Sequence, residues 1–130
     1  MLKFGEVYWL DLTKHTSPSK STMKSSHPVV VIQNEKLFSN KYDNVIVLPA
    51  TSFRKNKHWD EDTQNLEYTF HYLLKTDSYP KLRNDTVIKC EQIFTISSKF
   101  FTEPLFTLRN DDMRNILMKV ALVLGFNRIR

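Results

Sequence analysis

Two short apolar runs, joined by a polar connector, place the tightest limit on the fold of this chain. The first covers residues 28–32 and the second residues 44–48, with Pro49, Ala50 and Thr51 following the second run at once. Both runs are continuous rather than alternating, which is typical of strands that are covered on both faces. We therefore expect two strands in the core of a small β-barrel.

Polar side chains stand at the ends of these two runs. They are His27, Gln33, Asn34, Thr51 and Ser52. We expect them to lie at the mouth of the barrel, where polar groups are accessible for chemistry.

The remaining strands are predicted from shorter patterns. Residues 6–12 and 68–74 each read as one strand, and residues 86–96 read as one long strand or as two short ones with a bend near Glu91. The aromatic segment 100–108 is expected to supply an edge strand or an interface. A buried carboxylate needs a partner, so Glu91 is interpreted as part of a barrel-closing hydrogen-bond pair.

A C-terminal helix is predicted after Asn110, which we take as its N-cap, and it should end at Gly125. Asp111 and Asp112 fall in the first turn, where the helix dipole favours anions. Apolar residues then recur at helical spacing and indicate a core face or a dimer interface. They are Met113, Ile116, Leu117, Val120, Ala121 and Leu124.

Length and charge set the broad class of the protein. The chain has 130 residues, which favours a single domain over residues 1–130 with one hydrophobic core. Its 19 Lys and Arg residues against 14 Asp and Glu residues give a net charge of +5. This excess suits an anionic partner such as nucleic acid, although a modest positive charge also serves solubility alone.

The composition also excludes several classes. A single cysteine, Cys90, rules out an internal disulfide framework and a cysteine-rich zinc site, and its strand-like surroundings predict a small buried hydrophobe. No run approaches the roughly 18 apolar residues that span a bilayer. Glu6 and Asp11 lie where a signal peptide would be apolar, so we expect no membrane partner and a cytoplasmic protein.

Two polar segments interrupt the strands. Residues 13–26 are rich in Ser, Thr and Lys, and include Lys24; they read as a mobile loop that contacts phosphates or as a solvated linker. Residues 54–68 form a charged insert that begins with a basic cluster around Arg54. Its Trp59 offers a surface for stacking an RNA base, or else packs on the barrel or on a partner.

Five segments of the chain together resemble the MazF/PemK family of toxin endoribonucleases. Each is short and hydrophobic, but all five occur in the family's order across nearly the whole sequence. They lie at residues 5–12, 28–35, 45–52, 85–96 and 108–113. The resemblance implies a mainly β fold with a C-terminal helix, an SH3-like small β-barrel of the MazF/PemK/CcdB-like toxin type.

The resemblance also implies an activity, a site and partners. Members cleave single-stranded mRNA without a metal or cofactor, leaving 2′,3′-cyclic phosphate and 5′-hydroxyl ends. An Arg before the first strand and the Thr after the second carry this work in the family, and here these positions hold His27 and Thr51. A homodimer and an acidic, partly disordered antitoxin that blocks the RNA groove are implied as partners.

The histidine in place of arginine leaves two alternatives open. His27 is able to act as a proton shuttle and to donate to phosphate when charged, so that cleavage persists. Alternatively, the site is weakened and the protein binds RNA without turnover. Arg54 is a candidate for the missing cation, and Lys24, Ser52 and Gln92 are the remaining candidates for substrate binding.

Other chemistries find little support in the sequence. It has no glycine-rich phosphate loop, no H-E-x-x-H and no G-x-S-x-G motif, and its acids are not paired as metal ligands. We therefore expect no metal site. The alternative function is a non-catalytic module that binds RNA or protein, or a gyrase-directed toxin on the same barrel.

Overall fold

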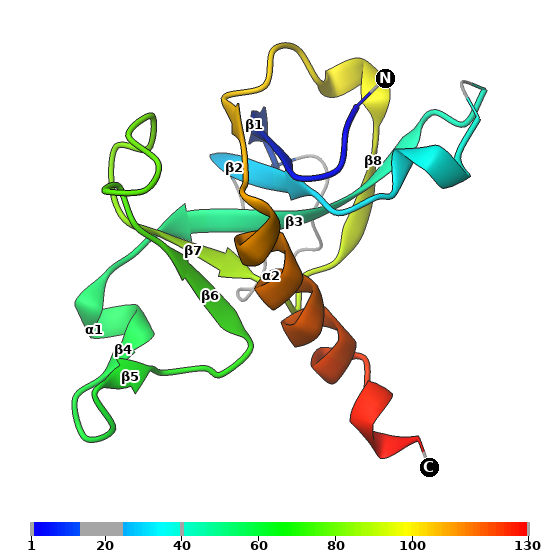
Figure 1. Ribbon diagram of the computed structural model, residues 1–130. Helices are drawn as coiled ribbons and strands as arrows, with labels where there is room; N and C mark the ends of the chain where they lie inside the picture. Colours follow the sequence, from blue (N-terminus) through cyan, green and yellow to red (C-terminus); the bar gives the residue numbers. More distant parts are fainter. Residues whose placement is uncertain (1, 14–24, 40, 130) are drawn as a thin grey trace.

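The computed structural model describes residues 2–13, 25–39 and 41–129, and these form a curled antiparallel sheet with a C-terminal helix (Figure 1). In chain order the strands are β1 (Glu6–Asp11), β2 (Ser26–Val31), β3 (Asn44–Ser52), β4 (Trp59–Asp60), β5 (Asn65–Leu66), β6 (His71–Leu74), β7 (Thr86–Lys89), β8 (Phe94–Ser97) and β9 (Phe106–Thr107). The α-helices are α1 (Lys55–His58) and α2 (Asn110–Val123), and the 3₁₀ turns are η1 (Glu35–Leu37), η2 (Ser98–Phe100) and η3 (Phe126–Arg128).

The sheet is organised around β3, the longest of its strands. The pairing order is β6-β7-β3-β2-β1-β9, and β8 also pairs with β3, while β4 and β5 form a separate two-stranded hairpin. Within the described chain β6 and β9 are the two ends of this order and do not pair with each other, and β8 pairs only with β3, so the sheet makes a half-barrel. The mainly β fold predicted from the sequence, with its C-terminal helix, is confirmed.

Both faces of the central strands are buried, as their continuous apolar runs predicted. On one face, Val30 and Leu48 pack with Met113, Ile116 and Val120 of α2. On the other face, Val29 and Val47 belong to a second cluster that Phe101 and other partly buried side chains cover. Because successive residues of a strand point to opposite faces, one run of valines supplies both cores.

The segment from β7 to β8 consists of two short strands, the second of the two alternatives considered. Ile88 in β7 pairs with Ala50, and Phe94 in β8 pairs with Val47, so Ile88 and Phe94 are six positions apart in the chain whereas their partners on β3 are three positions apart. The bend that absorbs this excess contains Glu91, as predicted. Cys90 beside it is fully buried, also as predicted.

Several boundaries differ from the prediction. β3 continues through Pro49 to Ser52, and β6 begins only at His71, because residues 68–70 form a turn closed by a bond from the His71 N–H to the Tyr68 carbonyl (3.1 Å). Asn110 is the first residue of α2 rather than its N-cap, a position that Arg109 holds.

The predicted end of α2 is confirmed. Gly125 follows the helix with φ of +84°, a left-handed conformation that glycine adopts without strain, and its N–H donates to the Leu122 carbonyl. Figure 1 shows α2 crossing the sheet and η3 carrying the chain away from the body of the molecule. None of the helices in the described part of the chain has the length and apolar character needed to cross a membrane.

The expectation that all five polar residues meet at one mouth was wrong. β2 and β3 are antiparallel, so His27 lies at the same end of the sheet as Thr51 and Ser52, whereas Gln33 and Asn34 lie at the opposite end. There the buried Gln33 side chain accepts a hydrogen bond from the Ile46 N–H (3.1 Å). Gln33 therefore satisfies the backbone of β3, which is a structural role.

Candidate active site

The strands β2 and β3 part at two prolines. Their last paired residues are Val29 and Pro49, and Pro28 is the next residue of β2. Proline has no N–H to donate, so neither Pro28 nor Pro49 is able to continue the ladder as a donor. Beyond this point β2 pairs with β1, and β3 pairs with β7. The two strand ends thus hold different neighbours, and the candidate residues lie on these ends.

His27 and Thr51 lie on the two separated ends. His27 and Thr51 each lie two residues beyond the last pair, Val29 with Pro49, where the two strands are no longer paired. Alternation along each strand places His27 on the face of Val29 and Thr51 on the face of Val47, which is the face of the second core cluster. Both side chains are half-buried. The His27 Nε2 atom lies 3.2 Å from the Ser25 hydroxyl oxygen, which orients the ring.

Ser52 and Arg54 extend the site along the chain. Strand alternation directs Ser52 to the face opposite Thr51, where its hydroxyl accepts a hydrogen bond from the Asn84 amide (3.4 Å). Arg54 follows β3 with an exposed side chain, and its N–H donates to the Nδ1 atom of His58 (2.8 Å). The backbone of Arg54 is thereby fixed while its guanidinium faces solvent.

The two other candidates are placed differently. Gln92 lies half-buried in the bend between β7 and β8, and its N–H donates to the Lys89 carbonyl (3.2 Å). Since β7 and β8 pair with the edge of β3 opposite to β2, Gln92 lies across β3 from His27. Lys24 falls outside the described residues.

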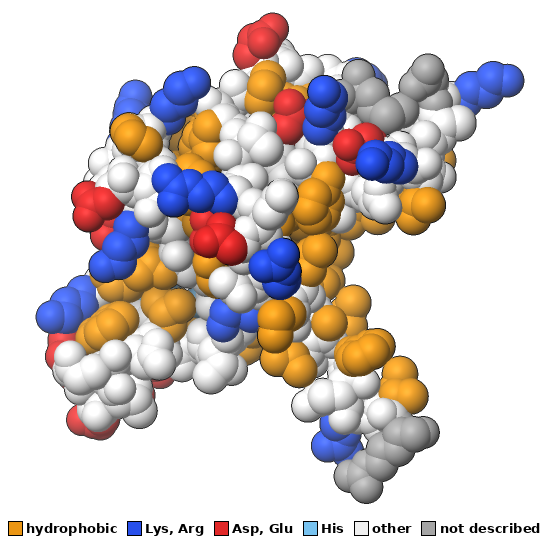
Figure 2. All heavy atoms as spheres, viewed as in Figure 1, with side chains coloured by type: hydrophobic (Ala, Val, Ile, Leu, Met, Phe, Trp, Pro, Cys, Tyr) orange, Lys and Arg blue, Asp and Glu red, His pale blue; other side chains and the backbone are white. Residues whose placement is uncertain are grey.

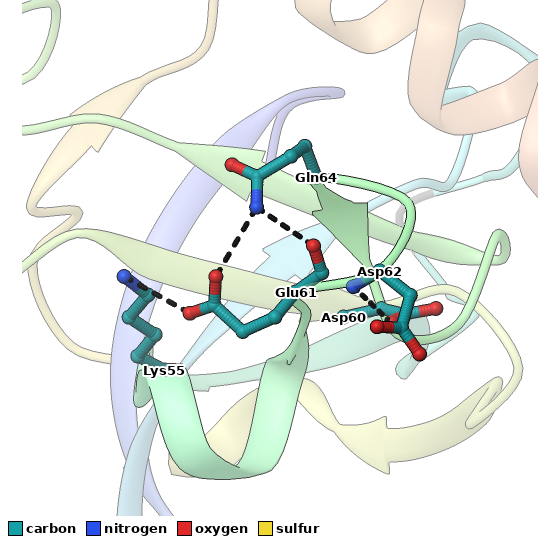
Figure 3. A network of polar contacts seen from close by, with 5 residues as sticks. All are labelled: Lys55, Asp60, Glu61, Asp62 and Gln64. Atoms are coloured by element: carbon teal, nitrogen blue, oxygen red, sulfur yellow. Dashed lines mark hydrogen bonds and ion pairs between the residues drawn. The ribbon is translucent and has the colours of Figure 1, made fainter.

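The insert after β3 folds on itself. Lys55 and Glu61 form an ion pair of 3.1 Å, and the Gln64 amide donates to the same carboxylate (Figure 3). This pairing offsets one charge of the predicted basic cluster. Trp59 is half-buried and meets the Phe53 ring edge-on, with ring centroids 6.3 Å apart. Of the two interpretations of Trp59, packing on the protein is the one that the structure supports.

Two buried histidines, His58 in the insert and His71 in β6, lie close together, and the sequence did not predict this proximity. His58 and His71 have ring centroids 6.1 Å apart, and the His71 Nε2 atom lies 3.6 Å from the Glu91 carboxylate. Burial lowers the pKa of His58, as do the nearby positive charges, His71 first and then Lys89. Burial is the largest single influence on the pKa of Glu91 and acts to raise it, but the contact with His71, the Glu91 backbone N–H and the charge of Lys89 together outweigh burial, so the net shift is downward.

Glu91 thus has the polar partner that its position required. The partner is His71 of the edge strand β6, rather than a hydrogen-bonded neighbour that closes a barrel. His58, His71 and Glu91 come from α1, β6 and the bend after β7, so spacing in the sequence gives no sign of their proximity. Among the described residues no three His, Cys, Asp or Glu side chains are grouped so that they could hold a metal ion.

Comparison with known proteins identifies the family. Residues 3–124 match the family described as the PemK-like, MazF-like toxin of type II toxin-antitoxin systems. The chain is 29% identical, over all of its 130 residues and 97% of the relative, to a protein named endoribonuclease MazF from Staphylococcus saprophyticus.

Solved structures show the same fold. A MazF from Deinococcus radiodurans superposes with a TM-score of 0.69 at 17% identity, covering 95% of this chain and 96% of the other. A mycobacterial endoribonuclease in complex with its cognate antitoxin gives 0.68 at 15% identity, covering 96% of each chain. The family match spans nearly the whole sequence, and so this chain belongs to the PemK-like, MazF-like toxins of type II toxin-antitoxin systems.

Proposed function

We propose that this protein is a cytoplasmic endoribonuclease toxin that cleaves single-stranded mRNA without a metal and is restrained by an antitoxin. The full-length similarity to a protein named endoribonuclease MazF supports the activity. The solved complex of a similar fold with its antitoxin supports the partner. The observation that supports the proposal for the site is that His27 and Thr51 each lie two residues beyond the last pair of β2 and β3, Val29 with Pro49.

The proposed chemistry uses groups that this chain supplies. The 2′-hydroxyl of the ribose loses its proton and attacks the adjacent phosphorus, while the bond to the 5′-oxygen breaks and that oxygen gains a proton. His27 acts in proton transfer, because imidazole exchanges protons near neutral pH. The Thr51 hydroxyl donates a hydrogen bond to a phosphate oxygen. The products are a 2′,3′-cyclic phosphate and a 5′-hydroxyl.

The transition state carries extra negative charge on the phosphate oxygens, and this charge needs a cation. Arg54 is assigned that role because its guanidinium is exposed three residues beyond Thr51, on a backbone that His58 holds in place. Ser52, Gln92 and Lys24 are assigned to substrate binding. The net charge of +5 favours both the RNA and an acidic, partly disordered antitoxin that competes with it.

The test is incubation of the purified protein with a long single-stranded RNA in EDTA, followed by analysis of the fragment ends. The wild type should give discrete cuts with cyclic phosphate ends. His27→Ala and Thr51→Ala should each slow cleavage by about 10² to 10⁴-fold, the usual effect of losing a group that transfers protons or stabilises charge.

Thr102→Ala is the matched control, because Thr102 is an exposed threonine near Val45, at the end of β3 opposite to Thr51, and should leave the rate unchanged. Intact RNA with a correctly folded wild type would sink the nuclease proposal and favour a module that binds without turnover. Cleavage that EDTA abolishes would instead contradict the metal-free chemistry.

A further inference from the structure

A pocket that shares no residue with the candidate active site lies between the insert, the start of β6 and α2. Its volume is about 390 Å³, within the range of small-molecule sites. Figure 2 shows the surface hollowed between the lobe formed by the insert and the C-terminal helix. The lining residues that carry the argument are Asp60, Glu67, Tyr68, His71 and Lys119.

His71, at one side of this pocket, has a buried polar side chain without a hydrogen-bond partner. Its side chain is 4% exposed, and neither ring nitrogen has a hydrogen-bond partner. The Glu91 carboxylate, 3.6 Å from Nε2, is too far away for a hydrogen bond. Every imidazole carries at least one N–H, and leaving a buried donor unpaired is unfavourable.

The other polar groups in the pocket have opposite charges. The Lys119 ammonium gives one of its three hydrogens to the Thr69 carbonyl (2.5 Å), which leaves two donors. The Asp60 carboxylate accepts from the Asp62 N–H (3.0 Å), whereas no hydrogen bond or ion pair to another described residue holds the Glu67 carboxylate. The pocket therefore presents strong donors and strong acceptors together.

An aromatic ring completes the set. Tyr68 is 48% exposed and stacks on Phe70, with ring centroids 5.3 Å apart and planes inclined by 20°. Its backbone carbonyl also accepts the His71 N–H, so the ring is attached to a fixed turn. An exposed tyrosine on a fixed backbone is a platform on which a planar ligand stacks, as in proteins that bind single-stranded RNA.

We propose that this pocket binds a guanine base of single-stranded RNA. Guanine carries an acceptor at O6, which matches the remaining donors of Lys119. It also carries donors at N1 and at its 2-amino group, which match the carboxylate of Glu67, and its rings stack on Tyr68. Adenine has no O6 acceptor, and the pyrimidines offer less stacking surface. The inference rests on the proposed function for the presence of RNA, and it makes the insert a site of base selection.

The test measures the binding of nucleoside 5′-monophosphates to the intact protein by calorimetry, with no cleavage step. Guanosine monophosphate should bind about tenfold or more tightly than the adenosine, cytidine and uridine monophosphates, the discrimination expected for one good bidentate contact. Glu67→Gln and Lys119→Met should each remove about tenfold of this affinity. Inosine monophosphate lacks the 2-amino group, so Glu67→Gln should weaken its binding much less.

Glu103→Gln and Lys81→Met are matched controls, since both residues are exposed and outside the pocket, and they should leave the affinities unchanged. Equal affinities for all four nucleotides would overturn the proposal, and so would a guanine preference that both pocket variants retain. Because binding is measured directly, a protein that leaves RNA intact but selects guanine would contradict only the proposed nuclease activity.

Discussion

At the scale of single residues, Asp112 connects the helix α2 to the sheet. One oxygen of its carboxylate accepts the Tyr72 hydroxyl (2.5 Å), and the other accepts the Tyr79 hydroxyl. The Tyr79 oxygen in turn accepts the N–H of Arg109, the N-cap residue of α2, which has no side-chain cap of its own (2.9 Å). Four polar groups, including the Arg109 N–H that has no partner within the helix, thereby satisfy one another at the start of the helix.

Removing the Tyr79 hydroxyl should destabilise the fold. Tyr79→Phe leaves both the Asp112 carboxylate and the Arg109 N–H without this partner, so the free energy of unfolding should fall by about 1.5 to 3 kcal/mol, the range for hydrogen bonds to charged groups. Urea denaturation measures the change. Tyr42→Phe, at an exposed tyrosine, is the control and should have no effect. An unchanged midpoint for Tyr79→Phe would show that the network adds nothing to stability.

The same residue predicts a dependence on alkaline pH. Burial raises the pKa of Tyr79 to about 12, with the Asp112 carboxylate acting in the same direction and the Arg109 N–H against it. A group whose pKa is higher in the folded state gives its full stabilisation below the unfolded value, about 10 for tyrosine, and loses it as the pH rises through the folded value.

The urea midpoint should therefore fall between pH 10 and about 12, and the fall should be smaller in Tyr79→Phe. Part of the fall should remain in that variant, because burial and the Glu6 carboxylate also raise the pKa of Tyr8. Identical curves for the two proteins would contradict the assignment to Tyr79.

At the scale of elements, the insert is held to the sheet by His58. This ring is buried and accepts the Arg54 N–H, while its backbone carbonyl accepts the Glu67 N–H (2.8 Å). The pKa of His58 is lower in the folded protein, first because of burial and then because of neighbouring positive charges. The unfolded insert therefore binds the proton more readily, and the folded insert loses stability as the pH falls below about 6.5.

Between pH 7 and pH 5, the backbone amides of Arg54 and Glu67 should exchange with solvent several-fold faster once the intrinsic effect of pH is removed. Hydrogen exchange followed by NMR measures this, with the amides of Val30 and Leu48 in the centre of the sheet as the internal control. If the protection factors of the Arg54 and Glu67 amides do not change between pH 7 and pH 5, protonation of His58 is not the event that releases the insert.

The sequence predicted the elements where one local pattern decides the structure. The runs at 28–32 and 44–48 are buried on both faces because valine and isoleucine dominate them. Gly125 marks the end of a helix because glycine adopts the left-handed conformation that this position requires. The sequence did not predict that β2 separates from β3, although Pro28 and Pro49 lie at the point where the pairing ends. The boundary at His71 was missed, because a turn bond overrides the apolar pattern before it.

The pocket and the histidine pair were beyond sequence reasoning for a different reason. The insert has no apolar period, so nothing in it indicates which of its side chains turn inward. His58 and His71 are in contact because α1 and β6 pack together. Lys119 joins the pocket from α2, which is far from the insert in the sequence. Of the proposed catalytic pair, each member was identified by the family resemblance, and the shared face came from the strand register.

At the scale of the whole molecule, the C-terminal segment is too apolar to stay exposed. Leu124, Phe126 and Ile129 are 70, 71 and 79% exposed, and Figure 2 shows hydrophobic side chains gathered along this end of the protein. Exposed apolar patches on soluble proteins mark association surfaces. We propose that a second copy of the chain covers this one, in line with the homodimer that the family resemblance implies.

Analytical ultracentrifugation should then find a species of twice the chain mass of 15.4 kDa, and Phe126→Glu should shift it toward the monomer by placing a charge in the interface. Leu37→Glu is the matched control, because Leu37 is equally exposed but lies on η1, away from the C-terminal segment, and it should leave the dimer intact. A monomeric wild type at high concentration would rule out this interface.

The separate pairing of β4 with β5 has a consequence for how such a chain diversifies. The hairpin takes no strand position in the seven-stranded sheet, and it is entered and left within a few residues of the end of β3 and the start of β6. Exposed turns that carry no part of a central sheet accept changes of length. Under the proposal that the pocket beside this hairpin selects guanine, exchanging hairpins of other lengths at this junction should alter base preference, while the strand ends that hold His27 and Thr51 stay as they are.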